Sequence, residues 1–433
     1  EKSVTLKFIN ENFTSQNVGL MCFRLLIEKL GITELIEKSN FPQTRAINRL
    51  SSILCFLALK LSNIRRYSAD DIWCMDRGGG LFAGLNVLPK TTWFSTYSHR
   101  VTKDMNITFL NKLHKIWLDN NLLSDTINPD FTTIPYWGDN EHLENNWSGK
   151  RTKALASMLV ILAQDPDSGI IDYGDADIRH KNQSQSILEF IDFYTEHDNN
   201  NLKFLVFDSK LTTYENLSKI NEKNIKFLTI QRRSQFIVNE LDKVESKNWK
   251  KVRIECGDNK NRDIYIYERT IQLPKYQGDI RQICIKVHGK IKPAIIITND
   301  FDLSNNIIVR KYARRWIIEK GISEQIEFFH LNRLSSSMVI KVDFDLTMSI
   351  LAHNLYRLMA MQLSRYSNCT STKIYEKFIQ NTGNIEIGEK TINVKLKKKR
   401  DLLFLLEVME KFQNIKIPQF EDRNLTFSGL SSS

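Results

Sequence analysis

The sequence lacks the motifs by which several large enzyme classes are identified. It contains no HExxH zinc motif, no GxSxG nucleophile motif, no Walker A sequence and no GxGxxG dinucleotide fingerprint. The triple glycine Gly78–Gly80 does not follow a predicted strand, and no Lys-Ser/Thr comes after it, so we interpret it as a flexible turn. Covalent hydrolase chemistry and nucleotide-cofactor chemistry therefore have no support in the sequence.

Paired cysteines and long apolar runs are missing as well. None of the cysteines forms a CxxC pair, and no histidine pair lies near them at zinc spacing, so we interpret them as buried thiols in a reducing compartment. No N-terminal signal pattern appears, and the most apolar run, residues 52–61, is far too short for a membrane span. The chain begins with Glu1 rather than Met, so we expect a trimmed N-terminus. Together these features predict a cytoplasmic protein. The six cysteines are Cys22, Cys55, Cys74, Cys256, Cys284 and Cys369.

The composition is that of a folded protein with a surplus of positive charge. The 433 residues are 42% hydrophobic and 10% aromatic, enough for two or three domains with proper cores. The formal net charge is +11. A surplus of base indicates a polyanionic partner, most simply nucleic acid, although a spread-out surplus also fits an ordinary basic enzyme. A DNA-binding role would make the protein nucleoid-associated.

The most informative stretch is residues 311–334, which has a helical pattern. Tyr312, Arg315 and Glu319 are spaced i, i+3 and i+7, so they share one face of the predicted helix. An ordinary explanation is an Arg315–Glu319 ion pair on a solvated face, worth a few tenths of a kcal/mol. The spacing alone favours that explanation.

This stretch resembles the helix that carries the last acidic residue in DDE transposases of the insertion-sequence-four type. Their signature reads Tyr, two residues, Arg, three residues, Glu, six residues, Lys. Tyr312, Arg315 and Glu319 match it, whereas position 326 is Ile instead of Lys. The resemblance implies an RNase H-like catalytic domain and a bacterial or archaeal insertion-sequence transposase. It also implies that Tyr312 and Arg315 contact phosphates or a displaced base.

The order of the remaining elements agrees with this resemblance. The pattern predicts strand, strand, strand, helix, strand, helix and strand between residues 127 and 233, followed by a β-rich insertion and then the Glu319 helix. That order is typical of the RNase H-like fold, a mixed α/β or α+β sheet with helices on both faces. The expected parts are a helical N-terminal DNA-binding domain (1–120), the first part of the catalytic domain (121–233), the β-rich insertion (234–300), the second part of the catalytic domain (301–366) and a C-terminal hairpin and helix region (367–433).

Within the N-terminal region, the helix predicted after Pro89 carries Trp93, Tyr97 and Arg100. A polar, basic and aromatic helix of this kind could enter a DNA groove. A solvated face of a helical packing domain explains the same residues equally well.

Three carboxylates stand where this fold would bring them together. Asp130 lies on the first strand, Asp208 ends the fourth strand, and Glu319 lies on the helix expected to cover the sheet. Phosphodiester cleavage and transfer need two divalent ions, and Mg²⁺ prefers carboxylate oxygens. We therefore predict that these three residues are catalytic and hold two Mg²⁺ or Mn²⁺ ions per active site.

Other acidic residues compete for these roles. Asp125 and Asp139 flank Asp130, and Glu324 and Glu327 follow Glu319. Asp139 lies beyond Pro135 and is expected off the strand, while Glu324 is about 140° around the helix from Glu319. Glu327 is about two turns farther on and close to the same face, which makes it the better substitute.

Basic and aromatic residues supply candidate DNA contacts. Individually each basic residue is better explained as a solvated charge, but as a group they fit the basic composition. Trp249 in the predicted insertion is a candidate for stacking on a flipped base. The candidate backbone contacts are Lys150, Arg151, Lys153, Arg232, Arg233 and the basic run at 395–400.

These observations lead to one principal hypothesis and two alternatives. The principal hypothesis is a transposase that cleaves DNA at the terminal inverted repeats of an insertion sequence and transfers the freed strand, working as a homodimer on double-stranded DNA. The first alternative is a transposase-derived DNA-binding protein without strand transfer, which Ile326 keeps open. The second is an RNase H-like nuclease acting on other substrates.

Overall fold

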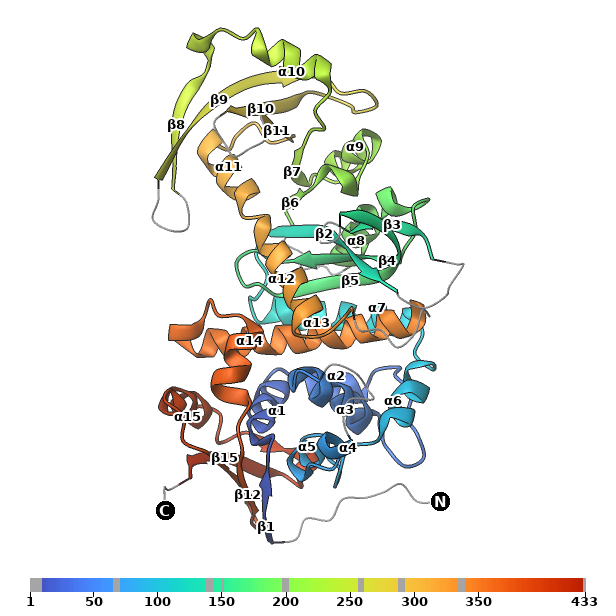
Figure 1. Cartoon of the computed structure of the whole chain (residues 1–433), viewed down its shortest axis with the longest axis vertical. Helices are drawn as coiled ribbons and strands as arrows, with labels where there is room; N and C mark the ends of the chain where they lie inside the picture. Colours follow the sequence, from blue (N-terminus) through green and yellow to red (C-terminus); the bar gives the residue numbers. More distant parts are fainter. Residues whose placement is uncertain are drawn as a thin grey trace.

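The architecture is a mixture of helices and mixed sheets stacked along one long axis (Figure 1). A ten-stranded sheet lies at one end, two long helices cross the middle, and a helical bundle with a five-stranded sheet lies at the other end. The mixed α/β character predicted from the sequence is confirmed. The computed structural model describes residues 10–64, 71–136, 143–148, 152–196, 202–255, 261–286, 293–332 and 339–430.

Helices fill most of the N-terminal segment. The most buried is α3, in which the Asn48 side chain accepts a hydrogen bond from the Ser51 N–H at the helix start and nearly every residue is inaccessible to solvent. It packs on α13, so this bundle shares its core with the rest of the chain. The helices are α1 (Met21–Lys29), α2 (Ile32–Glu37), α3 (Arg49–Leu61), α4 (Asp71–Cys74), α5 (Arg77–Phe82), α6 (Thr91–Ser98) and α7 (Lys103–Asp119).

Two expectations for this bundle change. The triple glycine is not a flexible turn but part of α5, where Asp76 caps the helix by accepting a hydrogen bond from the Gly79 N–H. A Cβ atom at Gly80 would lie 2.4 Å from the Asn86 carbonyl oxygen, so close backbone packing explains this glycine. In α6, Tyr97 is fully buried, which favours the packing explanation of that helix over groove reading.

The large sheet has the order β3-β4-β2-β6-β7-β11-β10-β9-β8, with β5 paired to the other side of β4. Strands β2, β6 and β7 are mutually parallel, while β4 and β5 are antiparallel to their neighbours. The strands are β2 (Thr126–Pro135), β3 (Asn145–Ser148), β4 (Lys153–Gln164), β5 (Ile171–Ile178), β6 (Phe204–Phe207), β7 (Lys226–Ile230), β8 (Lys250–Glu255), β9 (Asn261–Ile271), β10 (Ile280–Lys286) and β11 (Ala294–Thr298).

The β-rich segment continues the same sheet instead of forming one of its own. Strand β11 pairs antiparallel with β7, and β10, β9 and β8 follow outward from it. The sequence pattern indicated the strands but not this continuity, nor helix α10, which covers the outer strands (Figure 1). The insertion is therefore joined to the central strands through backbone hydrogen bonds.

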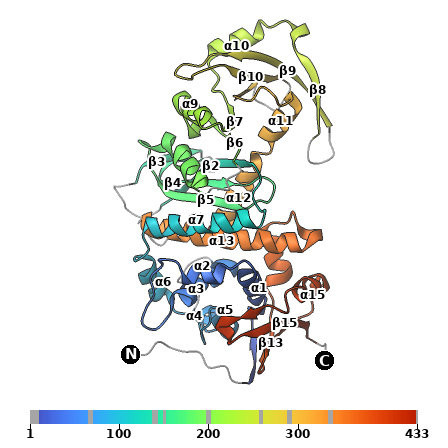
Figure 2. The same ribbon diagram turned by 180° about the vertical axis from the view of Figure 1, so that it is seen from behind.

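Helices cover both faces of the large sheet. Helix α12 packs on β2 and β4, and α9 packs on β7. When the molecule is viewed from behind, α8 and α9 lie on the near side of the sheet (Figure 2). The remaining helices are α8 (Ser186–Thr195), α9 (Tyr214–Glu222), α10 (Gln235–Asp242), α11 (Asn305–Ala313), α12 (Trp316–Glu327), α13 (Val339–Gln362), α14 (Ser371–Ile374) and α15 (Leu402–Glu410).

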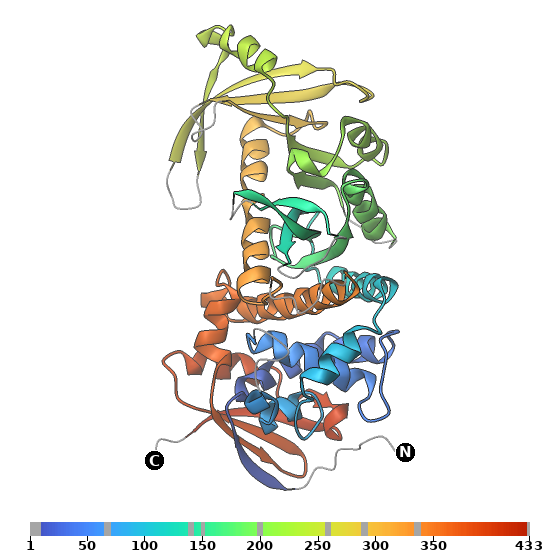
Figure 3. The ribbon, with the colours of Figure 1, turned by 45° about the vertical axis from the view of Figure 1, so that its right-hand side comes forward.

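The helix predicted over 311–334 is two helices, α11 and α12, that run almost in line beside the sheet (Figure 3). At their junction the N–H of Arg315 bonds to the carbonyl of Tyr312, and the N–H of Ile318 to that of Arg315. These bonds span three residues instead of four, so the backbone tightens without changing direction sharply. Helix α12 ends at Glu327, earlier than the pattern indicated.

The C-terminal region forms the second sheet together with an N-terminal strand. The predicted hairpin is present as β12 (Gly383–Ile387) and β13 (Thr391–Leu396), and β1 (Glu11–Ser15) pairs antiparallel with β12. Strands β14 (Lys416–Ile417) and β15 (Arg423–Gly429) complete the order β1-β12-β13-β15-β14. Among the described helices, none has the length and apolar character needed to cross a bilayer.

Candidate active site

Asp130 lies on β2, and Asp208 directly follows the neighbouring parallel strand β6. The ladder between β2 and β6 pairs Thr126 with Phe204 and Ile127 with Leu205. Asp130 and Asp208 are each four residues farther along than the first of these pairs, beyond the last paired residues. The charge of Asp208 raises the pKa of Asp130, so the two carboxylates lie near each other.

Local hydrogen bonds hold these two carboxylates. The Asp130 side chain is mostly buried, 17% exposed, and its Oδ1 accepts a hydrogen bond of 2.8 Å from the Phe131 N–H. Asp208 directly follows β6, is half-buried and accepts a hydrogen bond of 3.2 Å from the Ser209 hydroxyl. Asp208 therefore lies just beyond the end of β6, outside the strand ladder and near Asp130.

Glu319 reaches the same place from α12 through Arg315. The Arg315 guanidinium donates from Nη1 to Asp130 Oδ2 at 2.8 Å and from Nη2 to Glu319 Oε1 at 2.7 Å. The Glu319 side chain is 56% exposed, whereas that of Arg315 is 18% exposed. Arg315 thus links the sheet carboxylate to the helix carboxylate, and the surface ion pair expected from spacing alone is one arm of a larger cluster.

The pKa values in this cluster are perturbed. Burial raises the pKa of Asp130 to about 6; Arg315 and the Phe131 N–H oppose the shift, and the charges of Asp208 and Glu319 add to it. Burial also raises the pKa of Tyr312 to about 12. Burial lowers the pKa of Arg315, but the surrounding acidic groups outweigh it and the net shift is upward. Asp208 and Glu319 are therefore near enough to Asp130 for their charges to act on it.

The donor set fits divalent ions, with Arg315 as a cationic stand-in. Carboxylate oxygens are the ligands Mg²⁺ and Mn²⁺ prefer, and two of the three carboxylates already bind one cation, the guanidinium. Among the described residues, no three acidic, histidine or cysteine side chains are grouped tightly enough to hold an ion as they stand. Metal binding would therefore require Arg315 to move and the carboxylates to close in.

The competing acidic residues have other partners or lie farther away. Glu324 accepts hydrogen bonds from the Ser371 N–H and hydroxyl, so it anchors the start of α14. Glu327 is the last residue of α12, about 12 Å along the helix axis from Glu319. Asp125 accepts a hydrogen bond from the Thr126 hydroxyl. Asp139 is outside the described residues.

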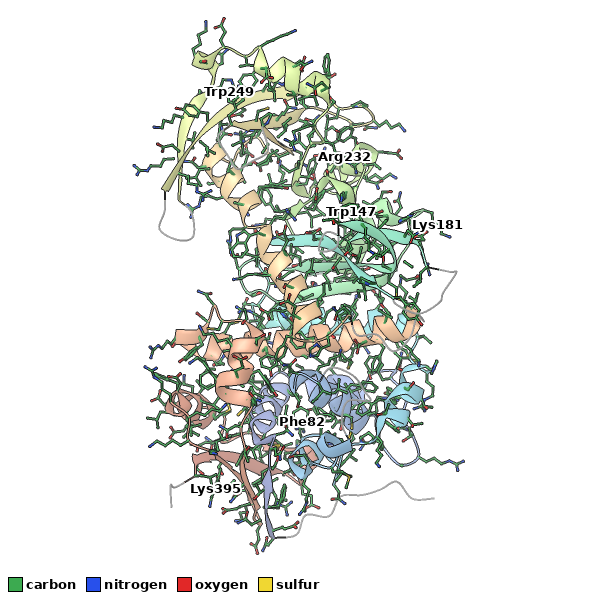
Figure 4. The ribbon with its side chains drawn as sticks, in the orientation of Figure 1. Phe82, Trp147, Lys181, Arg232, Trp249 and Lys395 are labelled. Atoms are coloured by element: carbon green, nitrogen blue, oxygen red, sulfur yellow. The ribbon has the colours of Figure 1, made fainter. Side chains whose placement is uncertain are left out.

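The structure contradicts the predicted stacking role of Trp249. Only 8% of this residue is exposed, and it packs with Leu241, Cys284 and Ile295 under α10 (Figure 4). The Lys286 ammonium lies 4.0 Å from the ring centroid and so covers the ring. Trp249 is a core residue because its indole completes the small cluster between α10 and the sheet, and it offers no free face to a base.

The predicted basic contacts are dispersed. Arg232 and Arg233 follow β7 and are exposed (Figure 4). Lys395 lies on β13 in the C-terminal sheet, at the far end of the molecule from Arg232. Lys150 and Arg151 lie outside the described residues. Among the described members of this group, Arg232 and Arg233 follow the end of β7, and Lys153 begins β4, whose first residues lie beyond the carboxyl end of β2.

A cavity that the sequence did not indicate opens beside Asp208. Its volume is about 470 Å³, and its lining includes Ser209, Lys210, Thr229 and Arg232. Thr229 is only 2% exposed, and within the described part of the chain its hydroxyl has no hydrogen-bond partner. In the sequence, only the closeness of Lys210 to Asp208, two residues apart, could have indicated this cavity. The other lining residues are far apart along the chain, and the fold brings them together.

Comparison with known proteins identifies the family of the chain. Residues 130–355 match the family described as transposase DDE domain. Among solved structures, the piggyBac transposase synaptic complex with hairpin DNA is similar at 11% identity and a TM-score of 0.41, covering 91% of this chain and 80% of that one. A search of curated proteins gave no significant match. Because the matched segment spans more than half of the 433 residues, the chain belongs to the transposase DDE domain family.

Proposed function

We propose that this protein is an insertion-sequence transposase of the insertion-sequence-four type, which cleaves DNA at terminal inverted repeats and transfers the freed strand. The observation that carries the proposal is that Arg315 binds both Asp130 and Glu319, while the charge of Asp208 raises the pKa of Asp130. This proximity of three acidic residues that are far apart in sequence supports a shared catalytic site. The signature spacing of Tyr312, Arg315 and Glu319 supports the same assignment.

We propose an RNase H-like catalytic core for the strands β5, β4, β2, β6 and β7. Three antiparallel strands followed by two parallel ones, with helices on both faces, have the order expected for that fold. The proposed divisions are the helical DNA-binding domain at 1–120, catalytic segments at 121–233 and 301–366, the insertion at 234–300 and the C-terminal region at 367–433.

In the proposed reaction Asp130, Asp208 and Glu319 would hold two Mg²⁺ or Mn²⁺ ions. When bound, such ions about 4 Å apart supply an activated water and stabilise the leaving oxygen. The three carboxylates would hold the ions in place, and the covering helix α12, which packs on β2 and β4, would exclude solvent from the sheet side. Hydrolysis breaks one P–O bond and leaves a 3′-hydroxyl and a 5′-phosphate. The 3′-oxygen then forms a new P–O bond with a phosphodiester of either the opposite strand, giving a hairpin, or target DNA, and the 3′-oxygen of the attacked strand leaves as a hydroxyl.

Tyr312 and Arg315 are proposed to orient the DNA. A guanidinium can bind a phosphate through two parallel hydrogen bonds, which fixes direction as well as charge. The Tyr312 hydroxyl is protonated at neutral pH, as in any tyrosine with its ordinary pKa, so it can donate to a phosphate oxygen; burial raises that pKa further, to about 12. Arg232 and Arg233, exposed at the end of β7, are positioned to contact the backbone farther along. A homodimer would bring two transposon ends together.

The alternative is a DNA-binding protein without strand transfer. Position 326, where the signature has Lys, is Ile on α12, so one expected basic contact is missing. A nuclease without joining activity is the other alternative. Both make the same prediction for binding but differ in their products.

The test uses a duplex made from the DNA that flanks the gene, where short inverted repeats are expected. Wild-type protein should nick the repeat end with Mg²⁺ or Mn²⁺ and then form joined products. Asp208→Asn should abolish cleavage and retain DNA binding. Binding without cleavage by wild type would establish the first alternative, and cleavage without joined products the second.

A further inference from the structure

Arg315 occupies an unusual position for a DNA-contacting residue. Its two terminal nitrogens are both bound to acidic groups of the site, Asp130 at 2.8 Å and Glu319 at 2.7 Å. Only 18% of its side chain is exposed. A guanidinium engaged in this way has its hydrogen-bonding edge directed into the carboxylate cluster and away from solvent.

This contact would compete with metal binding. The guanidinium occupies Asp130 Oδ2 and Glu319 Oε1 and neutralises the negative charge that would attract a divalent ion. An ion held by the same carboxylates would lie close to the guanidinium, and the two positive charges would repel each other. Asp130 and Glu319 therefore favour either Arg315 or the ion.

The two arms of the bridge differ in how easily they open. Glu319 is 56% exposed, so water can replace the guanidinium there at little cost. Asp130 is 17% exposed, and its pairing with Arg315 offsets part of the cost of burying its charge. The junction between α11 and α12 holds the Arg315 backbone through its bond to the Tyr312 carbonyl, so the side chain, not the helix, has to move.

We propose that Arg315 is a built-in competitor for the divalent ions: it neutralises Asp130 and Glu319 and leaves them when the ions bind. This inference rests on the proposed function, because it takes the three carboxylates as the metal ligands. A released guanidinium is able to bind a phosphate of the DNA. Arg315 thereby couples ion binding to DNA binding, since it is available to the phosphate only after the carboxylates have exchanged partners.

The test measures Mn²⁺ affinity on the full-length protein without DNA, from the electron paramagnetic resonance signal of free Mn²⁺. Removing the competitor in Arg315→Gln should tighten Mn²⁺ binding by about fivefold or more. Arg315→Lys keeps one charge but cannot bridge two carboxylates, so it should fall between wild type and Arg315→Gln. The matched control is Arg314→Gln, because Arg314 pairs with Asp167 at 2.6 Å and touches none of the three carboxylates; its affinity should equal that of wild type.

A second readout is the rise in Tm on adding Mn²⁺, which should be larger in Arg315→Lys than in wild type and stays informative if Arg315→Gln folds poorly. Equal or weaker Mn²⁺ binding in both Arg315 variants would overturn the competition. Asp208→Asn distinguishes failure of the proposed metal site from failure of the proposed competition by Arg315. If it loses Mn²⁺ binding while the Arg315 variants are no tighter, the metal site stands and the competition is wrong. If it binds Mn²⁺ as wild type does, the proposed metal site is wrong and the competition is wrong with it.

Discussion

Replacing Asp130 by Asn should stabilise the folded protein in the absence of divalent ions. The folded-state pKa of Asp130 is raised from 3.8 to about 6, chiefly by burial. A raised pKa means that the folded state holds the proton more tightly than the unfolded state does. The stability that this proton contributes is complete below pH about 4 and is lost as the pH rises through about 6. Asn resembles the protonated form at every pH.

The expected size follows from the shift. Each pKa unit corresponds to about 1.36 kcal/mol, so a rise from 3.8 to about 6 costs the ionised protein about 3 kcal/mol. For a chain of this length that is about 3 °C in Tm. The advantage of Asp130→Asn should be near zero at pH about 4, grow up to pH about 6 and stay constant above it.

The assay is urea unfolding with EDTA, at pH about 5 and at pH about 7.5, for wild type and Asp130→Asn. Asp192→Asn serves as the control, because this carboxylate is on the surface and pairs with Lys223. Added Mn²⁺ should reverse the order by stabilising only the wild type. An Asn variant that is less stable than wild type at the higher pH, or an advantage that does not depend on pH, would show that Asp130 is not held at an electrostatic cost.

Three other substitutions test the surroundings of the site. Gly321→Ala should lower the free energy of unfolding by about 1–3 kcal/mol and reduce cleavage, because its Cβ would lie 2.7 Å from Gln164 Oε1 and push α12 away from β4. An unchanged free energy of unfolding and an unchanged cleavage rate would contradict this packing. Glu324→Gln should lower Tm, because the hydrogen bonds from Ser371 lose their charge assistance, and should leave metal-dependent cleavage within about threefold of wild type. Loss of cleavage with an unchanged fold would indicate that Glu324 is a metal ligand. Arg232→Ala should weaken DNA binding and lower the slope of log affinity against log salt concentration by an amount equal to about one phosphate contact. An unchanged slope would show that Arg232 does not contact DNA.

Much of the central sheet could be predicted because its signals are local. The strand at β2 and the buried run at β4 are set by β-branched and apolar patterning, and the amphipathic repeat of α8 is equally clear. For the same reason Asp130 could be placed on its strand, β2, and Asp208 at the end of β6. Their order along the chain then sufficed to expect a shared site.

The remainder depends on contacts that sequence patterns do not encode. The pairing of β1 with β12 joins Glu11 to Ile387, and the junction of β11 with β7 depends on backbone bonds across the insertion. Trp249 looked exposed because lysines flank it, yet the indole turns into the cluster beneath α10. Spacing predicted the Arg315–Glu319 pair, but not the bond from Arg315 to Asp130, which needs the helix to lie on the sheet.

The most direct test of the account is a crystal structure of the protein with Mn²⁺, using the anomalous signal to locate the ions. Anomalous peaks from Mn²⁺ are expected between Asp130, Asp208 and Glu319. The Arg315 guanidinium should no longer contact the carboxylates of Asp130 and Glu319. Mn²⁺ bound elsewhere, with Arg315 still bridging Asp130 and Glu319, would contradict it.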